Sequence, residues 1–171
     1  YSTEYRDPGG AGYRAFLLVA QADALAGVSQ VRFGIEWDLS SINPFGWTPC
    51  GDSEVMDPGF YTGSGGNLIS WDPTTNCQRA VIGSDGAHAL VGAFYLYSYG
   101  PGEFKVVPDP AATPQAFMVA DCNGEVSYPA FRGGSIGDGE GFPGYNPCLT
   151  GTPVQTTRWG TVKALYGSTE N

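Results

Sequence analysis

The two acidic residues best placed to act together are Glu36 and Asp38, at the end of the stretch VRFGIEWD (31–38). Same-face neighbours two residues apart on a strand stand about 7 Å apart, and glycosidases use two carboxylates roughly 5–10 Å apart. The strict alternation of apolar and polar residues in this stretch predicts a strand with one buried and one wet face. Because wet faces carry acids by default, we interpret both residues as part of a scaffold strand. We expect no enzyme, and a glycosidase ranks as the third hypothesis.

A second group of reactive residue types, Ser84, Asp85 and His88, lies within the five residues SDGAH. A Ser-His-Asp triad is recognised by its geometry on separate elements, and the sequence contains no GxSxG nucleophile elbow. His88 is the sole histidine, which disfavours a metal site built on imidazoles. We interpret this segment as a turn that leads into a strand.

The Gly-rich stretch GDGEGFPGYN contains Asp138 and Glu140. Calcium prefers oxygen ligands in loops of this kind, although the spacing is not that of an EF-hand, which needs acids at fixed offsets and a terminal Glu. Asp138 and Glu140 are therefore the candidate calcium ligands, and a solvated turn is the alternative. We predict no resident metal and no cofactor.

Three tyrosines, Tyr95, Tyr97 and Tyr99, alternate along HALVGAFYLYSYG (88–100) and so share one face of a predicted strand. Tyrosine combines an apolar body with a polar tip, which suits protein interfaces and sugar rings. An intermolecular contact and simple burial under residues 39–79 are both open alternatives. The interface or stacking candidates include four further aromatic residues: Trp47, Trp71, Trp159 and Tyr166.

The composition of the 171 residues favours one all-β domain. Glycine (26), proline (13) and aromatic residues (13%) are typical of short strands joined by turns. The formal charge of −9, without a basic cluster, excludes nucleic acid and anionic membrane surfaces as favoured partners. The sequence contains no run of about 18 apolar residues, so it predicts no membrane-spanning helix. Because the chain starts at Tyr1 without methionine, we expect a removed signal peptide or a trimmed chain.

The four cysteines are Cys50, Cys77, Cys122 and Cys148, and none lies in a CxxC pair, which argues against zinc. An even number in a Gly-rich chain with few lysines favours disulfides and an oxidising compartment. Of the three possible pairings we expect Cys50–Cys77 and Cys122–Cys148, because each pair closes one long loop. Free buried thiols are the alternative.

The predicted elements divide the chain into three parts. Residues 1–12 form an extended arm, residues 13–155 a β-sandwich of the jelly-roll or immunoglobulin-like kind with long loops, and residues 156–171 a short amphipathic helix. In the apolar strand, alternation places Leu90 on the same face as Phe94. The strands are expected at residues 13–23, 31–38, 67–71, 88–100, 104–107 and 115–122, with a long polar stretch at 39–79.

The order of these segments resembles the cohesin-type β-sandwich of secreted bacterial proteins. The matching motifs are ALAGVSQVRFGIEWD, DGAHALVGAFYLYSYGPGEFKV, NGEV and GSI, over residues 13–38 and 85–136. The resemblance implies the fold, an extracellular setting and a non-catalytic module for binding and assembly. The chain departs from the family in its cysteines, its 39–79 stretch and its helical tail, so the family's dockerin partner is not carried over.

We predict a secreted structural protein that self-associates, as in the subunit of an extracellular filament or surface layer. The N-terminal arm (1–12) and the segment 159–166 are the parts expected to reach a neighbour, the arm by strand addition. The partner is another copy or another cell-surface protein. The alternative is a carbohydrate-binding module that stacks a polysaccharide on its aromatic residues.

Overall fold

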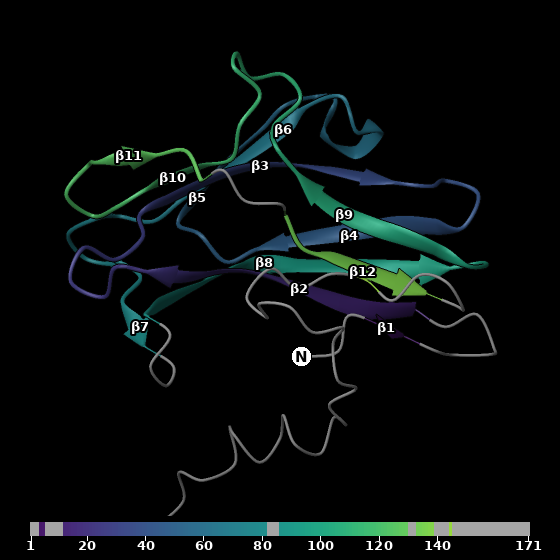
Figure 1. Cartoon of the computed structure of the whole chain (residues 1–171), viewed down its shortest axis with the longest axis horizontal. Helices are drawn as coiled ribbons and strands as arrows, with labels where there is room; N and C mark the ends of the chain where they lie inside the picture. Colours follow the sequence, from purple (N-terminus) through teal and green to yellow (C-terminus); the bar gives the residue numbers. More distant parts are fainter. Residues whose placement is uncertain (1–3, 6–11, 82–85, 130–132, 139–143, 145–171) are drawn as a thin grey trace, which may run out of the picture.

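The computed structural model describes residues 4–5, 12–81, 86–129, 133–138 and 144. Twelve strands and one short 3-10 helix make up this part of the chain, and Figure 1 shows them arranged in two layers. In chain order they are β1 (Glu4–Tyr5), β2 (Gly12–Ala22), β3 (Gln30–Trp37), β4 (Ile42–Pro49), β5 (Ser53–Met56), η1 (Phe60–Thr62), β6 (Gly66–Ser70), β7 (Ala80–Val81), β8 (Ala87–Ser98), β9 (Gly102–Val107), β10 (Met118–Ala120), β11 (Val126–Ser127) and β12 (Ser135–Asp138).

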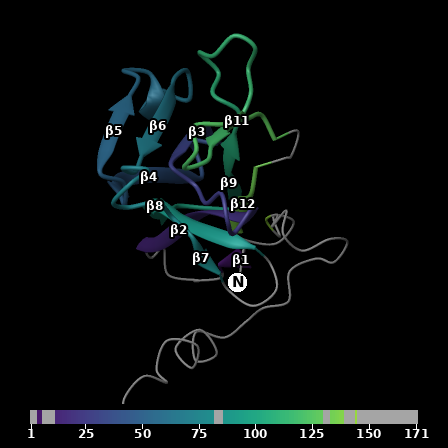
Figure 2. The ribbon, with the colours of Figure 1, turned by 90° about the vertical axis from the view of Figure 1, so that its left-hand side faces the viewer.

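The larger sheet is organised around β3. Its strand order is β1-β12-β9-β3-β10-β11, and β6 pairs with the other edge of β3 and carries β5. Strand β9 pairs with residues 34–37 of β3, and β10 pairs with residues 30–32 on the same edge. The chain therefore leaves this edge after Val107 and returns at Met118, and the intervening loop 108–117 stands out from the sandwich in Figures 1 and 2.

The smaller sheet has the order β2-β8-β4, with β7 also paired to β8. A register shift lies between Leu17 and Leu18 of β2, which pair with Gly92 and Leu90. Such a bulge inserts one extra residue, so the side chains on its two sides no longer follow a single alternation between the faces of the sheet. The prediction that Leu90 shares a buried face with Phe94 is therefore wrong, since Leu90 is exposed and Phe94 is buried.

Residues 39–79, the long polar stretch in which the sequence indicated one short strand, contain more regular structure than expected. They contain β4, β5, η1 and β6. Pro44 and Pro49 did not prevent β4, because β4 pairs only with β8 among the described strands and so lies at an edge, where proline is tolerated. The expected short strand at 67–71 is confirmed as β6.

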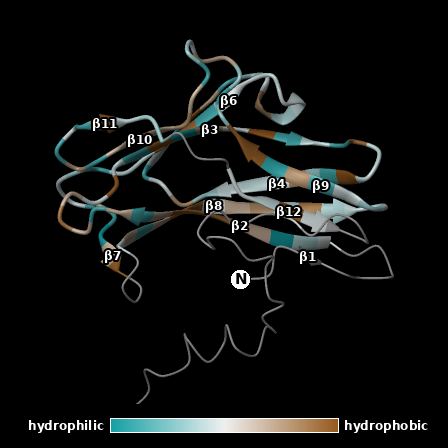
Figure 3. Cartoon of the chain, viewed as in Figure 1, coloured by the Kyte–Doolittle hydropathy of each residue, from teal (hydrophilic) through white to brown (hydrophobic). Residues whose placement is uncertain are grey.

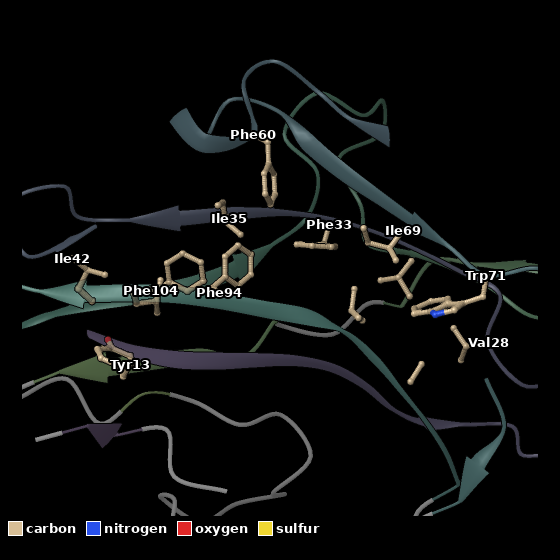
Figure 4. Close-up of a cluster of buried hydrophobic side chains, with 14 residues drawn as sticks. Tyr13, Val28, Phe33, Ile35, Ile42, Phe60, Ile69, Trp71, Phe94 and Phe104 are labelled. Atoms are coloured by element: carbon tan, nitrogen blue, oxygen red, sulfur yellow. The ribbon is translucent and has the colours of Figure 1, made fainter. Parts of the chain in front are cut away.

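The core lies between the two sheets. Figure 4 shows its side chains pointing inward from both layers, with Phe33 and Phe104 from the larger sheet and Phe94 from the smaller one. Phe60 of η1 is also fully buried, so the 3-10 turn caps the core. In Figure 3, apolar and polar positions follow each other along the same strands, as expected for strands with one buried face.

One disulfide links Cys77 to Cys122, across 45 residues of sequence. Cys77 lies three residues before β7 of the smaller sheet, and Cys122 lies two residues after β10 of the larger sheet. The expected Cys50–Cys77 and Cys122–Cys148 pairing is therefore wrong. Cys50 is exposed and forms no disulfide within the described ranges, and Cys148 lies outside them. The bridge links the segment between β6 and β7 to the turn after β10.

The all-β, disulfide-containing sandwich fold is confirmed. Part of the expected N-terminal arm belongs to the sandwich, because Glu4 and Tyr5 pair in parallel with β12 of the same chain. The expected helix at 156–171 lies outside the described residues. Within the described ranges, the structure contains no helix long and apolar enough to cross a membrane.

Candidate contact surface

The outer face of the smaller sheet carries a cluster of exposed aromatic side chains, which we call the aromatic face. Its members are Phe16 of β2, Phe45 of β4, Tyr95 and Tyr97 of β8, and Tyr99 directly after β8. The exposed fractions are 52% for Phe16, 57% for Phe45, 46% for Tyr95 and 58% for Tyr99. The tyrosines are therefore not buried beneath residues 39–79, and one of the two alternatives from the sequence is removed.

The register of the strands brings these side chains together. Arg14 of β2 lies opposite Tyr95, and residues opposite each other in an antiparallel pair share a face. The Phe45 ring centroid lies 6.5 Å from that of Tyr95 and 6.0 Å from that of Tyr97. The Tyr95 ring also lies across β2 at Gly12, where an added Cβ would stand 2.1 Å from its hydroxyl. Glycine at this position thus leaves room for the Tyr95 ring beside the neighbouring strand.

Two of the predicted stacking residues do not belong to this face. Trp71 is only 3% exposed, and its indole N–H donates to the Cys50 carbonyl at 3.0 Å. Trp47 packs toward the core, with its ring centroid 4.3 Å from that of Phe94. The prediction that these tryptophans form a stacking surface is wrong, because β4 and the segment after β6 turn them inward. The other two candidates, Trp159 and Tyr166, lie outside the described residues.

Phe16, Phe45 and Arg14 were not identified from the sequence as surface residues. A signal existed for β2, because Arg14 and Phe16 are two residues apart in YRAFLLVA and so share one face of the strand. A charged arginine indicates that this face is the outer one. No comparable signal existed for Phe45. It lies at a register shift between Pro44 and Gly46, and only the pairing with β8 shows which way it points.

Glu36 and Asp38 lie on the exposed rim of the larger sheet, as the sequence predicted. With Trp37, Glu103 and Lys105 they line a hollow of about 200 Å³. The Lys105 ammonium lies 3.3 Å from a Glu103 carboxylate oxygen and 3.8 Å from one of Glu36. The carboxylate of Glu36 is therefore part of a surface ion-pair group.

Asp38 has the wrong electrostatics for a proton donor. The side-chain hydroxyl of Ser40 donates to it at 2.7 Å and the Ser40 backbone N–H at 2.9 Å, and these bonds lower the pKa of Asp38. A glycosidase acid needs the opposite, a raised pKa. Asp38 therefore stabilises the turn after β3 through its hydrogen bonds to Ser40.

Two other turns are held by aspartates in the same way. Backbone N–H groups of Thr75 and Thr74 donate to Asp72, and they lower its pKa. The Glu125 backbone N–H is the largest of the contributions that lower the pKa of Asp121, in the turn between β10 and β11. Both carboxylates are exposed, so each of these bonds adds only a small amount of stability.

We expect the melting temperature to fall at acidic pH. Asp38, Asp72 and Asp121 have folded-state pKa values below the ordinary 3.8. Their stabilising contribution is therefore complete above pH 3.8 and is lost as the pH falls through the lowered values. Circular dichroism melts between pH 2 and 7 should be level above about pH 5 and decline below about pH 4. An Asp72→Asn/Asp121→Asn variant should show a shallower decline, and an unchanged decline would contradict this assignment.

The remaining predicted candidates are only partly within the described residues. His88 Nδ1 lies 3.0 Å from the Gly86 carbonyl oxygen at the start of β8, while Ser84 and Asp85 lie outside the described ranges. Asp138 ends β12, and Glu140 is outside the described ranges. Among the residues that the structure describes, no group of three or more His, Cys, Asp or Glu could hold a metal ion.

An ion pair between a buried aspartate and a half-buried arginine fastens loop 108–117 to the larger sheet. Asp109 is fully buried and pairs with the Arg32 guanidinium, which also lies 3.6 Å from Asp57. The Ala111 backbone N–H donates to Asp109 at 2.8 Å. Gly66 of β6 lies beneath the carboxylate, where an added Cβ would stand 2.2 Å from its carbon. The loop therefore covers part of the outer face of the larger sheet.

Comparisons with known proteins agree with this architecture. No protein-family model matches the chain, and no curated protein matches its sequence. Among solved structures, it is similar to a cohesin module from a family 33 glycoside hydrolase of Clostridium perfringens ATCC13124, with a TM-score of 0.51 and 11% sequence identity. The match covers 80% of this chain and 90% of that chain. The cohesin-like fold expected from the sequence is thus confirmed.

Proposed function

We propose that the chain is a secreted, non-catalytic assembly module that associates with further copies of itself, as a subunit of an extracellular filament or surface layer. The aromatic face is the observation that carries this proposal. Its rings remain between 46% and 58% exposed for four of the five members. Monomeric proteins seldom leave several large rings together in water, and such patches mark interaction sites.

The chemistry of the aromatic face fits a protein partner. Tyrosine, phenylalanine and arginine are enriched at protein interfaces, and Arg14 lies beside Tyr95 in this cluster. The fold supports the same assignment, because the cohesin resemblance implies a module for binding and assembly. The Cys77–Cys122 disulfide supports a secreted setting, since disulfides persist in oxidising compartments.

A carbohydrate-binding module is the second candidate, because the tyrosines present both ring faces and hydroxyl groups. The tilt between the rings weighs against it. Tyr97 and Tyr99 are inclined by 48°, Phe45 and Tyr95 by 52°, and Phe45 and Tyr97 by 84°. A flat polysaccharide surface needs rings in one plane, whereas a protein partner can fill the spaces between tilted rings. Another cell-surface protein is a further candidate partner for the aromatic face of this chain.

The proposal is tested by the assembly state of the full chain. Sedimentation velocity over a concentration series should show association that grows with concentration, and negative-stain electron microscopy should show the larger assemblies. Monomers at every concentration and salt condition would overturn self-association. Retention on an insoluble polysaccharide, with no association in solution, would favour the carbohydrate-binding alternative instead.

A further inference from the structure

The two sheets of the sandwich differ in charge. None of the 17 acidic residues of the chain lies on β2, β4, β7 or β8, the strands of the smaller sheet. The larger sheet carries acids on five of its strands, including Glu36 on β3, Glu54 on β5 and Glu103 on β9. Among the described strands, those that form the aromatic face therefore carry no carboxylate, on a chain with a formal charge of −9.

This difference decides which contact between two copies is favourable. A head-to-tail contact with the outer face of the larger sheet would place the aromatic face of one copy against the acidic strands of the next. Carboxylates such as Glu36 and Asp38 would then lose water without gaining a partner, which is costly. A contact between two aromatic faces covers no carboxylate, and it leaves the acids of both copies in solvent.

The aromatic face is also largely preorganised. Tyr95 lies against Gly12, Phe45 contacts the rings of Tyr95 and Tyr97, and the Tyr97 and Tyr99 centroids are 4.9 Å apart. Rings that already hold one another in place lose little side-chain entropy when a partner covers them. Arg14, which lies opposite Tyr95, gives each face one cation that an aromatic ring of the other copy can accept.

The size of the face limits the area that the contact can bury. Three strands about 4.8 Å apart and about ten residues of about 3.3 Å each give a surface of roughly 14 by 30 Å. Two copies would bury on the order of 900 Å², less than the ~1,200–2,000 Å² of stable complexes. The contact should therefore be weak, with a dissociation constant of about 10⁻⁵ M or higher.

We propose that two copies of this chain pair through their aromatic faces about a two-fold axis, in a weak dimer that salt strengthens. This inference rests on the proposed self-association and names the surface and symmetry of one contact. A two-fold pair is closed, so growth into a filament or surface layer needs a second contact elsewhere on the chain. Each copy carries the same negative charge, so raising the salt concentration screens the repulsion between them. A head-to-tail contact between a basic and an acidic surface would respond to salt in the opposite direction.

The test uses the full chain and three single substitutions. Phe45→Asp places a carboxylate on each side of the proposed contact and should weaken association at least about tenfold. Val55→Asp is the matched control, because Val55 is 63% exposed on β5 of the larger sheet and the charge change is the same. Its association should stay within about twofold of that of the unaltered chain. An equimolar mixture of Phe45→Asp and Phe45→Arg should regain association, because only a face that meets itself brings the two changes together.

The outcomes separate the symmetry from the proposed function. If the unaltered chain associates but Phe45→Asp has no effect, the mixture does not recover, or salt weakens the contact, the two-fold pairing is wrong and self-association stands. If the unaltered chain remains monomeric up to about millimolar concentration, both fail. Thermal melts confirm folding of each variant, and Tyr95→Asp replaces Phe45→Asp if the latter does not fold.

Discussion

Replacement of Phe94 by alanine is expected to lower the free energy of unfolding by about 3–5 kcal/mol. Phe94 is 1% exposed, and its ring centroid lies 4.3 Å from that of Trp47 and 4.8 Å from that of Phe104. Phe104 belongs to β9 of the other sheet, so this ring joins the two layers. Its removal leaves a cavity that the packed surroundings fill only in part. Urea unfolding followed by tryptophan fluorescence measures the loss.

The neighbouring residue on the same strand supplies the control. Tyr95 points outward and is 46% exposed, so Tyr95→Ala should cost less than about 1 kcal/mol. Similar losses for the two variants would contradict the assignment of one face of β8 to the core and the other to solvent.

Replacement of Arg32 by alanine is expected to cost about 3 kcal/mol. The substitution leaves the Asp109 carboxylate fully buried without its ion-pair partner, and an uncompensated buried charge is strongly destabilising. Because Asp109 anchors loop 108–117, hydrogen exchange in this loop should also become faster. The same urea unfolding experiment gives the stability, and amide exchange measured by mass spectrometry gives the local effect.

Two further variants separate this ion pair from an ordinary surface charge. Lys105 lies in an exposed ion-pair group with Glu36 and Glu103, so Lys105→Ala should cost less than about 1 kcal/mol. In Arg32→Ala/Asp109→Asn no charge is left buried, and this double variant should be more stable than Arg32→Ala alone. A double variant less stable than Arg32→Ala would show that the loss comes from packing and not from the unpaired carboxylate.

Elements with a strong local pattern could be predicted from the sequence. The alternation in VRFGIEWD gives β3 within one residue at each end, with Glu36 and Asp38 exposed. The Asn-Gly turn after Cys122 connects β10 to β11 in an antiparallel pair. Both predictions depend on neighbouring residues alone, since alternation fixes side-chain direction and Asn-Gly favours a tight turn.

Elements whose position depends on distant pairing were predicted less well. Strand β4 contains two prolines and has no clear alternation, and its pairing with β8 makes it a strand. Trp47 and Trp71 are aromatic in the same way as the three tyrosines, yet they point into the core. Local composition does not distinguish an inward from an outward aromatic residue when a bulge or an irregular strand precedes it.

The sequence by itself determined the all-β class, the cohesin-like order of segments and the shared face of Tyr95, Tyr97 and Tyr99. These features follow from period-two alternation and from turn residues along one stretch of chain. Only the tertiary structure decided that Cys77 pairs with Cys122, that Phe16 and Phe45 join the tyrosines, and that the smaller sheet presents a face without carboxylates. The physical reason is that a disulfide and a surface patch both require proximity in space. That proximity is set by strand register and sheet order, which arise from contacts far apart in the sequence.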